Sequence, residues 1–600
     1  MSRSGFKRFE FFDVDSLSSD IVATLGCTPT CAAAEGGMLM FGDRTGHIIL
    51  SDRNFHISAR HRVFRGEVKG LAYLYDSASI NKQYIVVLGD DAPPQTDSSG
   101  NKPPPLYFVK IYAASDFVRP LHVLNATVND AVMSCFAVLS DGYQIAVGYE
   151  NGAVILFSGR YLQEVSNTPI RNAAYSVLQT SHSFPVTSLH FCEIPSKKSS
   201  DRRIRLFAVM DTPDIPALDL SQGGDEAASA QRPPDPGMNG DDPKLAGVLI
   251  FDTSVTLGSA PGNTSDFVAA PRHPVRVLDE RGAPARCASF MRGQSELVVA
   301  RNEAVYNYSI EDRGGALAIA GDKQCICAVG RYTMIVSVEE RIAVPVVGAS
   351  AGAHGLDGEL PTYMKPKRPV VNIYDLKNKI ICGTSKKYHL ALNDRVLFCL
   401  NDGGVVYLIT TGGSMLRFRE KDTHRKLDVL LNQTSPPLYS LAIMLAAEEQ
   451  LEPAEIMKLY KQYGDHLYEE KDFDGAIAQY SHTVGYIPSS SVITKFLDPY
   501  RISNLIAYLE KLHAKNLAAS DHITLLLSCY AKIRDDAQIN NLLESIALNP
   551  NTKTVPVATA AGTGASKAGT PSATAAPSFN AFASGGKVHL DVTISSNLFN

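Results

Sequence analysis

The ten cysteines of this 600-residue chain are the side chains best suited to metal or redox chemistry. No Cys-x-x-Cys pair occurs among them; three residues separate Cys27 from Cys31, and one separates Cys325 from Cys327. A structural zinc site needs a second pair of cysteines or histidines at similar spacing, and neither pair has one. We therefore expect buried or unreactive thiols, no metal ligands and no cofactor.

Acid–base catalysis would need histidines or carboxylates combined with a nucleophile, and the sequence does not combine them. The carboxylates of Glu469–Asp474 fall at a predicted helix end and turn, where solvated charges are usual. G-x-S-x-G and H-E-x-x-H motifs are absent. Four histidines on predicted helices have no cysteine or carboxylate matched to them: His466, His482, His513 and His522.

The segment Gly562–Thr570, "GTGASKAGT", superficially suggests a phosphate-binding loop. Its Lys567 follows a serine, whereas the motif requires a glycine before the lysine, and no predicted strand precedes the segment. We assign no catalytic residue and expect a protein that is not an enzyme.

Composition and charge narrow the class of protein. The chain is 45% hydrophobic and 20% charged, with a net charge of −5, which argues against general nucleic-acid binding. Its richest apolar run, Leu438–Ala447, is too short to span a bilayer, and its charged start does not resemble a signal peptide. We expect a cytoplasmic protein. We also expect at least two domains, because a chain of 600 residues is too long to form a single hydrophobic core.

Most of the chain repeats one pattern, in which two apolar runs flank a tight polar turn. Asn151-Gly152 and Asp402-Gly403 are predicted to supply the positive φ angles of such turns. The runs are nearly continuous, which indicates strands covered on both faces. Repetition at roughly 40–60 residues predicts an all-β propeller of about seven blades over residues 1–433; a two-layer sandwich is the alternative. The clearest repeats are 38–50, 144–157, 297–308 and 396–409.

Three segments interrupt this pattern with compositions rich in proline, glycine, serine and aspartate. They lie near residues 90–105, 211–243 and 347–369. Such sequences bury too little apolar surface to offset the entropy of ordering. We predict disordered insertions in the propeller.

The spacing of the apolar residues then changes to that of amphipathic helices, and Pro436-Pro437 is expected to mark the boundary. This change predicts an α-solenoid over residues 434–549. Six residues fall at the spacing of a tetratricopeptide-like or clathrin-like helical hairpin. Two small residues allow close helix approach, two aromatic residues fill the surrounding space, and a proline ends the unit. No sustained heptad supports a coiled coil. The six residues are Gly464, Leu467, Phe473, Ala476, Tyr480 and Pro488.

The last fifty residues change composition twice. Residues 550–585 are of low complexity and predict a disordered linker. Residues 586–600 are apolar again and are interpreted as the start of a further segment. A solenoid that ends without a capping repeat predicts a longer parent protein.

Three helical segments resemble the family of vacuolar protein sorting-associated protein eleven. They read "YGDHLYEEKDFDGAIAQY" (463–480), "YIPSSSVITKFLDPYRISNLIAYLEKLH" (486–513) and "ASDHITLLLSCYAKIRD" (519–535). The resemblance is weaker over the propeller, where "FKRFEFFD" (Phe6–Asp13) is its most similar piece. The alanine-rich segment after residue 550 departs from the family pattern.

This resemblance implies a scaffold subunit of the HOPS and CORVET membrane-tethering complexes, which act in vesicle docking, membrane fusion and protein transport to the vacuole. It implies class C vacuolar sorting subunits as direct partners, Rab GTPases and SNAREs as indirect ones, and a peripheral position on vacuole and late endosome membranes. It does not imply nucleic-acid binding.

Two other functions remain open from the sequence. Members of this family carry a C-terminal RING zinc domain associated with ubiquitin ligase activity, but no cysteine follows Cys529 here. Zinc and ligase chemistry therefore cannot be carried over to this chain, although a longer parent could supply them. A clathrin- or coatomer-like coat subunit is the other alternative.

Overall fold

The computed structural model describes residues 6–17, 21–75, 83–92, 104–128, 131–159, 161, 175–180, 184–195, 201–212, 246–256, 274–340, 367–385, 390–391, 394–432 and 434–548. The chain divides into two compact units, Met1–Tyr460 and Lys461–Asn600, which are treated separately below. The predicted insertions lie mostly, and the predicted segments 550–585 and 586–600 wholly, outside the described residues. Two parts differ from the prediction, because Asp90 and Lys367–Pro369 belong to strands.

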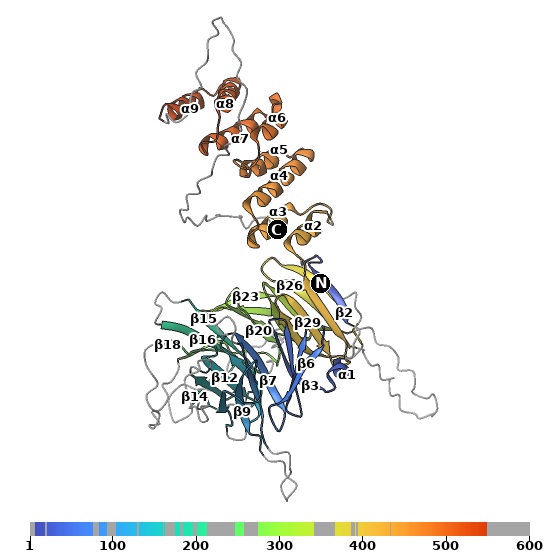
Figure 1. Ribbon diagram of the computed structural model, residues 1–600. Helices are drawn as coiled ribbons and strands as arrows, with labels where there is room; N and C mark the ends of the chain where they lie inside the picture. The colour runs from blue at the N-terminus through green and yellow to red at the C-terminus, as the bar shows by residue number, and fades with distance from the viewer. Residues whose placement is uncertain are drawn as a thin grey trace, which may run out of the picture. The chain divides into compact units, whose positions relative to one another are not determined.

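Within the described residues, the strands of the first unit form seven sheets arranged around one axis (Figure 1). The first strand of each sheet contacts the first strand of the next, and that of the seventh contacts that of the first. The ring is therefore closed, and the predicted seven-bladed β-propeller is confirmed.

The first four blades follow one another along the chain. Blade one contains β3 (Pro29–Glu35), β4 (Met38–Asp43), β5 (His47–Asp52) and β6 (Ile57–Arg62). Blade two contains β7 (Val68–Tyr75), β8 (Gln83–Asp90), β9 (Tyr107–Ala113) and β10 (His122–Asn125). Blade three contains β11 (Met133–Val138), β12 (Gln144–Tyr149), β13 (Val154–Ser158) and β14 (Tyr175–Gln179). Blade four contains β15 (Val186–Ile194), β16 (Asp201–Met210), β17 (Val248–Asp252), β18 (Val255–Thr256) and β19 (Val275–Asp279).

The last three blades complete the ring. Blade five contains β20 (Ala288–Met291), β21 (Glu296–Ala300), β22 (Val305–Tyr308) and β23 (Arg313–Leu317). Blade six contains β24 (Lys323–Val329), β25 (Tyr332–Glu340), β26 (Lys367–Asp375) and β27 (Ile380–Thr384). Blade seven contains β28 (Val396–Asp402), β29 (Val405–Thr410) and β30 (Met415–Glu420).

Central strands are buried on both faces, as the continuous apolar runs predicted. Ile85 to Leu88 of β8 are completely buried, as are Leu39, Met40 and Phe41 of β4. One apolar cluster joins β8 and β9 of blade two to β12 and β13 of blade three. Each blade is therefore covered by its neighbours, which is why its sequence does not alternate between apolar and polar residues.

Two hairpin turns differ from the prediction in detail. Asn151 does not adopt positive φ; Gly152 alone does, with φ +82°. At the second turn the two central residues are Gly403 (φ +57°) and Gly404 (φ +88°), and Asp402 is the last strand residue. Asp402 is held there because its buried carboxylate accepts hydrogen bonds from the Gly37 N–H (3.0 Å) and Arg53 Nε (2.6 Å).

The N-terminal segment joins blades six and seven. β1 (Lys7–Arg8) pairs in parallel with β27, and β2 (Phe12–Leu17) pairs antiparallel with β30. Between them, the Phe11 N–H donates to the Cys382 carbonyl (2.7 Å), and the Phe11 carbonyl accepts from the Lys421 N–H (2.9 Å). The outer strand of blade seven thus comes from the opposite end of the propeller sequence, which locks the ring.

Helices begin at Thr423, earlier than the predicted boundary at residue 434. The double proline Pro436-Pro437 lies between the first two of these helices and not at the end of the propeller. A short helix, α1 (Ile21–Leu25), precedes blade one. The helices after β30 are α2 (Thr423–Asn432), α3 (Tyr439–Glu448), α4 (Pro453–Glu469), α5 (Phe473–His482), α6 (Ser489–Lys495), the 3₁₀ turn η2 (Pro499–Arg501), α7 (Ile502–Ala514), α8 (Ser520–Ile533) and α9 (Asp536–Leu548).

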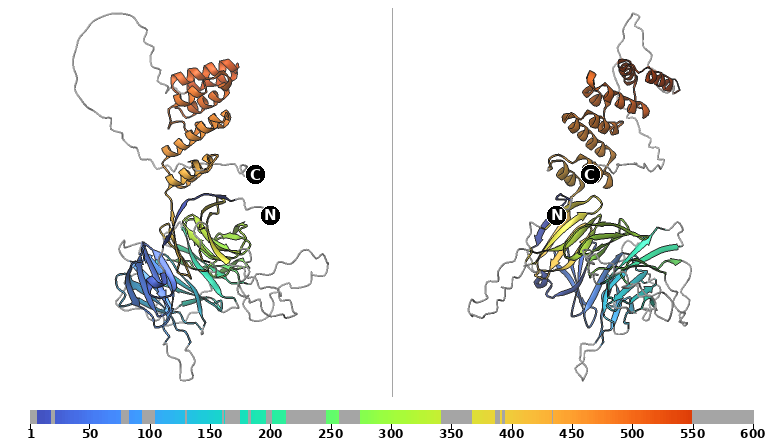
Figure 2. Two further views of the ribbon diagram at one scale, coloured as in Figure 1. Left: turned by 90° about the vertical axis from the view of Figure 1, so that its right-hand side faces the viewer. Right: turned by 180° about the vertical axis from the view of Figure 1, so that it is seen from behind.

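The helices of the second unit stack in sequence order (Figure 2). α5 contacts α7, α7 contacts α8, and α8 contacts α9. They share one core, which includes Ala476, Tyr480, Phe496, Tyr508 and Leu526. Helical hairpins that bury one face against the next hairpin form a solenoid.

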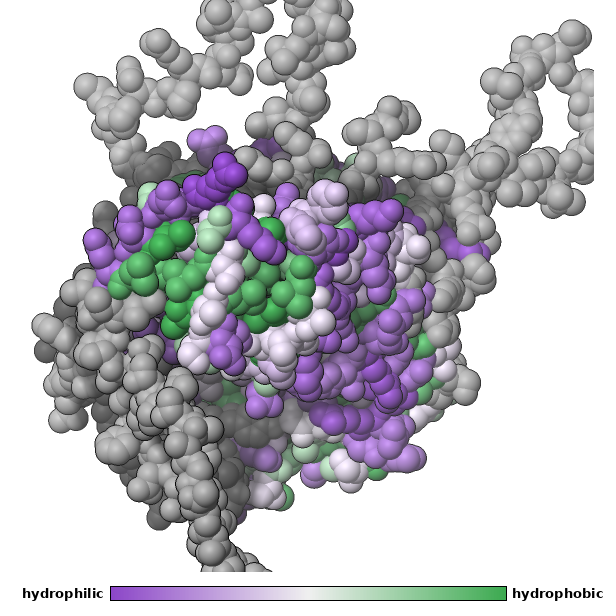
Figure 3. Space-filling model, turned by 90° about the horizontal axis from the view of Figure 1, so that it is seen from above, coloured by the Kyte–Doolittle hydropathy of each residue, from purple (hydrophilic) through white to green (hydrophobic). Residues whose placement is uncertain are grey.

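Hydrophobic side chains also reach the surface of the last two helices. Ile533 of α8 and Leu543 of α9 are each about half exposed. The view from above in Figure 3, which labels no residue, shows hydrophobic residues gathered in a green patch. Scattered exposed apolar residues are ordinary, whereas gathered ones indicate a contact surface.

We predict that Phe11→Ala destabilises the propeller by about 3–5 kcal/mol, because Phe11 is 1% exposed at the seam that closes the ring. Urea unfolding of purified protein measures this change. Val118→Ala is the control, since Val118 is 85% exposed, and should change the unfolding free energy little. Equal stability of the two variants would contradict closure by the N-terminal segment.

Candidate functional site

Charged side chains connect the propeller to its first two helices, all within the first unit. Lys426 of α2 is buried, and its Nζ contacts Glu420 Oε1 (2.5 Å) at the end of β30. The same Nζ contacts Glu449 Oε1 (2.6 Å) directly after α3. Glu449 also accepts a hydrogen bond from Thr423. One buried cation therefore holds the last blade, α2 and α3 together.

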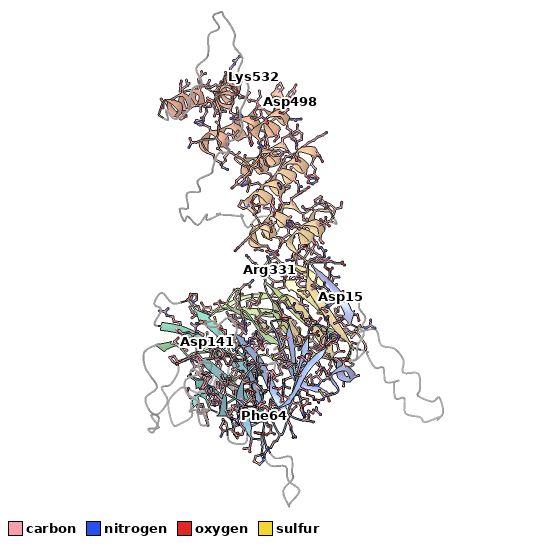
Figure 4. The ribbon with its side chains drawn as sticks, viewed as in Figure 1. Asp15, Phe64, Asp141, Arg331, Asp498 and Lys532 are labelled. Atoms are coloured by element: carbon pink, nitrogen blue, oxygen red, sulfur yellow. The ribbon has the colours of Figure 1, made fainter. Side chains whose placement is uncertain are left out.

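A second set of ion pairs joins blade six to α3. Arg331, in the turn between β24 and β25, pairs with Asp375 Oδ2 (2.7 Å) and with Glu448 (Figure 4). Lys377 Nζ contacts the other oxygen of Glu448 at 2.8 Å. Asn378 Nδ2 donates to Asp375 Oδ2 (2.8 Å). We call the two sets together the joint: Arg331, Asp375, Lys377, Glu420, Lys426, Glu448 and Glu449.

Tyr332 lies under the joint and is completely buried. The Arg331 guanidinium and Lys426 Nζ each lie 5.6 Å from the centre of its ring, within the range of cation–π attraction. Phe12 of β2 packs edge-on against the same ring, with centroids 5.3 Å apart. The ring closure and the joint therefore share one aromatic side chain.

The electrostatics of the joint favour its charged forms. Burial tends to raise the pKa of Glu448, but the hydrogen bond from Lys377 and the charge of Arg331 outweigh it and lower that pKa. Burial tends to lower the pKa of Arg331, because it disfavours the charged guanidinium. The charge of Asp375 outweighs burial and raises that pKa. Hydrogen-bonded ion pairs of this kind fix orientation more reliably than they add stability.

Five of the six helical-repeat residues nominated from the sequence lie around the contact of α4 with α5, within the second unit. A Cβ added to Gly464 would lie 2.8 Å from Tyr480 Cε1, so the helices are in close contact there. Tyr480 is 1% exposed, and its hydroxyl donates to Asp465 Oδ1 (2.6 Å). Ala476 is completely buried, and Leu467 and Phe473 pack at the edge of the same core. Pro488 lies elsewhere: α5 ends at His482, and Pro488 is the N-cap of α6.

The thiols of Cys327 and Cys399 are in contact, with Cys325 near them, but these cysteines have no disulfide. All ten cysteines are free, and burial raises the pKa of Cys31 to about 12. No group of three or more potential ligands is arranged to hold a metal ion within the described residues. His466 does have a carboxylate neighbour, Glu470, at 3.4 Å, contrary to the sequence interpretation, but this is a surface pair one helical turn apart.

Two open hollows lie between neighbouring blades. No serine, threonine, cysteine or histidine of the described chain lines either one. Neither hollow therefore combines a nucleophile with a histidine base. The first, about 570 Å³, is lined by residues that include Glu296, Asn307, Arg331 and Lys377. The second, about 430 Å³, is lined by residues that include Arg203, Arg205, Asp252 and Arg276.

Sequence reasoning did not nominate the joint. Arg331 and Glu448 are 117 positions apart in the sequence, and Arg331 and Asp375 are 44 apart. A local sequence pattern therefore cannot predict that these residues form ion pairs. One local signal exists in α2, where Lys426 shares the buried face of an amphipathic helix with Leu427 and Leu430. A lysine on an apolar face indicates a buried acidic partner.

Two family models match this chain. The PEP5/VPS11 N-terminal model covers residues 6–228 and 267–420, which include all the described strands of the propeller except β17 and β18. The PEP5/VPS11 clathrin repeat model covers residues 468–560. Together they match both parts of the architecture.

Curated relatives give the same result. A vacuolar protein sorting-associated protein 11 homolog of Dictyostelium discoideum is 26% identical over 90% of this chain and 50% of its own length. The Homo sapiens homolog is 27% identical over 90% of this chain and 50% of its own. The Mus musculus homolog is 34% identical over 47% of this chain and 28% of its own. The chain thus spans about half the length of the curated relatives that it matches along most of its sequence.

We predict that the joint weakens as pH falls. The pKa of Glu448 is lowered from 4.5 on folding, so its contribution to stability is present above pH 4.5 and is lost as pH falls through the folded value. The stability difference between wild type and Glu448→Gln should therefore shrink below about pH 4.5. Urea unfolding at several pH values between 7 and about 3 measures it.

An Arg331→Met background tests whether the ion pair causes this behaviour. There Glu448→Gln should have a smaller effect at neutral pH, with a coupling energy of about 0.5–3 kcal/mol. A stability difference that stays constant with pH, or purely additive effects of the two substitutions, would count against the joint.

Close helix contact at Gly464 gives a further prediction. Gly464→Leu should destabilise the second unit by about 1–3 kcal/mol, because a side chain there collides with the Tyr480 ring. Leucine favours helix formation, so any loss reports packing and not propensity. Gln462→Leu, at an exposed position of the same helix, should be close to neutral. Thermal unfolding followed by circular dichroism compares them, and equal melting temperatures would refute the packing argument.

Proposed function

The chain belongs to the PEP5/VPS11 family, and from this premise we propose that it is a scaffold subunit of a multisubunit membrane-tethering complex. The coarser part of this function, vacuolar protein sorting, follows the names of its relatives. The finer part is a role in HOPS- and CORVET-type complexes, which dock vesicles with endosomes and vacuoles before membrane fusion.

The observation that carries the proposal is the joint. A tether must transmit force between the surfaces that it binds, and flexible linkers do so poorly. Here the propeller continues into α2 and α3 through a buried lysine and a three-way arginine–carboxylate arrangement. Such a connection holds a propeller surface and the first helices as one body, which suits a scaffold.

We further propose that the chain acts without chemistry of its own. In the described part of the chain, the two hollows between blades are lined by no serine, threonine, cysteine or histidine. Function then resides in surfaces that bind other proteins. The proposed direct partners are the other class C vacuolar sorting subunits, with Rab GTPases and SNAREs as indirect ones.

The proposed location is peripheral, on the cytoplasmic side of vacuole and late endosome membranes. Among the described residues, no helix has both the length and the hydrophobicity needed to cross a bilayer.

Affinity purification of the full-length protein from cells tests the proposal. We expect the other class C subunits to be recovered with it at equal stoichiometry, because a scaffold subunit is present once in each complex. Quantitative mass spectrometry of the purified material gives the ratio. Failure to recover those subunits would defeat the tether proposal, and assembly of the protein into cages on membranes would favour the coat alternative.

A further inference from the structure

The connection between α6 and α7 is a rigid loop in the second unit. Asp498 caps it, because its Oδ1 accepts a hydrogen bond from the Tyr500 N–H (3.0 Å). Pro499 follows and starts the 3₁₀ turn η2, which closes with a bond from the Arg501 N–H to the Asp498 carbonyl (2.9 Å). A side-chain cap and a proline both restrict the backbone before any partner binds.

Arg501 fixes this loop to the underlying helices. Its guanidinium lies 4.0 Å from the centre of the Phe473 ring and 5.1 Å from that of Tyr468. It also donates to the Tyr468 hydroxyl, which itself donates to the Lys495 carbonyl (2.9 Å). Tyr468 packs edge-on against Phe473 and Phe496, with centroids 5.3 and 5.4 Å apart. The loop is therefore held by a stacked arginine above a packed aromatic cluster.

Two large hydrophobic side chains of this loop are nevertheless in solvent. Tyr500 is 96% exposed and Leu497 is 56% exposed. Neither contributes to the core of the second unit, in which Tyr480 and Tyr508 are at most 1% exposed. An exposed aromatic residue on a preorganised loop is typical of a binding hot spot, since little entropy is lost when it is buried by a partner.

Carboxylates outnumber cations in this loop and in the turn that lies beside it. The turn between α4 and α5 lies beside the loop, because Arg501 stacks on Phe473, the first residue of α5. Glu469–Asp474 and Leu497–Arg501 together contain five carboxylates and two cations, and one of those cations is the anchored Arg501. Asp498 lies at the outer edge of the helical stack (Figure 4). The surface therefore favours a basic partner.

We propose that Leu497 and Tyr500 form a docking surface for another subunit of the same complex, one that offers an apolar pocket bordered by lysines or arginines. The Tyr500 ring enters the pocket, and the carboxylates around it pair with the basic border. This inference rests on the proposed function, because it takes the partner to be a subunit of the tethering complex.

Substitutions in the full-length protein test the surface. Each variant is purified by affinity from cells, and every co-purified subunit is quantified by mass spectrometry. With Tyr500→Ala, recovery of at least one subunit should fall about tenfold or more, as expected for a hot-spot aromatic. Tyr500→Phe keeps the ring and should retain that recovery. Glu469→Lys should lower recovery of the same subunit, and raised salt should weaken the wild-type association as well.

Tyr486→Ala is the matched control, because Tyr486 is 58% exposed but lies in the turn between α5 and α6. It should leave every recovery at the wild-type level. Melting temperatures of all variants should equal that of wild type, since the Tyr500 ring is outside the core.

The outcomes separate the two proposals. If the wild-type protein recovers no class C subunit, the proposed function fails. If wild type recovers them and Tyr500→Ala does so equally, only the docking surface is refuted. Loss of self-association of this chain in Tyr500→Ala, with subunit recovery unchanged, would also refute it, because the occupant would be a second copy.

Discussion

Each blade of the propeller has two apolar faces, and neither can be covered except by a neighbouring blade. Because of this constraint, a closed ring is the arrangement that covers both apolar faces of every blade. An open row of seven blades would expose two apolar faces and would leave the outer edge of β30 unpaired. The pairing of β2 with β30 covers that edge, and the contact of β28 with β3 covers the two faces. Asp15 of β2 adds contacts to Arg417 (2.8 Å) and Arg419 (3.0 Å) across the same pair.

Closure also determines where the helices can attach. The segment that closes the ring crosses the outer edges of blades six and seven, and the chain leaves blade seven beside it at Lys421, whose N–H donates to the Phe11 carbonyl (2.9 Å). Blade six supplies Arg331 and Asp375, and the end of blade seven supplies Glu420. Tyr332 contacts Phe12 of the closing strand on one side and the cations of the joint on the other. The helices therefore attach at blades six and seven, where the N-terminal segment closes the ring.

How much of this could be predicted from the sequence depended on the distance between interacting residues. The blades were predictable, because a hairpin is a local pattern, and so was the Gly464–Tyr480 contact, which spans one helical hairpin. The pairing of Phe6–Asp13 was not predictable, because its partners Ile380, Cys382 and Glu420 are about four hundred residues away. The charges of the joint were missed for the same reason. The start of the helices was placed too late because Pro436-Pro437 resembles a domain boundary, whereas the charged start of α2 does not resemble a buried helix.

Two tyrosines of the second unit show how surface function can be separated from stability. Tyr480 and Tyr500 are twenty positions apart, and both belong to segments in which the chain resembles its family. Tyr480 is packed and hydrogen-bonded, so the fold alone accounts for it. Tyr500 is almost fully in water, where an aromatic ring contributes nothing to folding and adds an aggregation risk. The backbone beneath it is fixed by a cap, a proline and a stacked arginine, which hold the ring in position. Packing in the core explains the buried residues of the second unit, but it does not explain Tyr500. A partner that covers this exposed and firmly held ring is the best explanation.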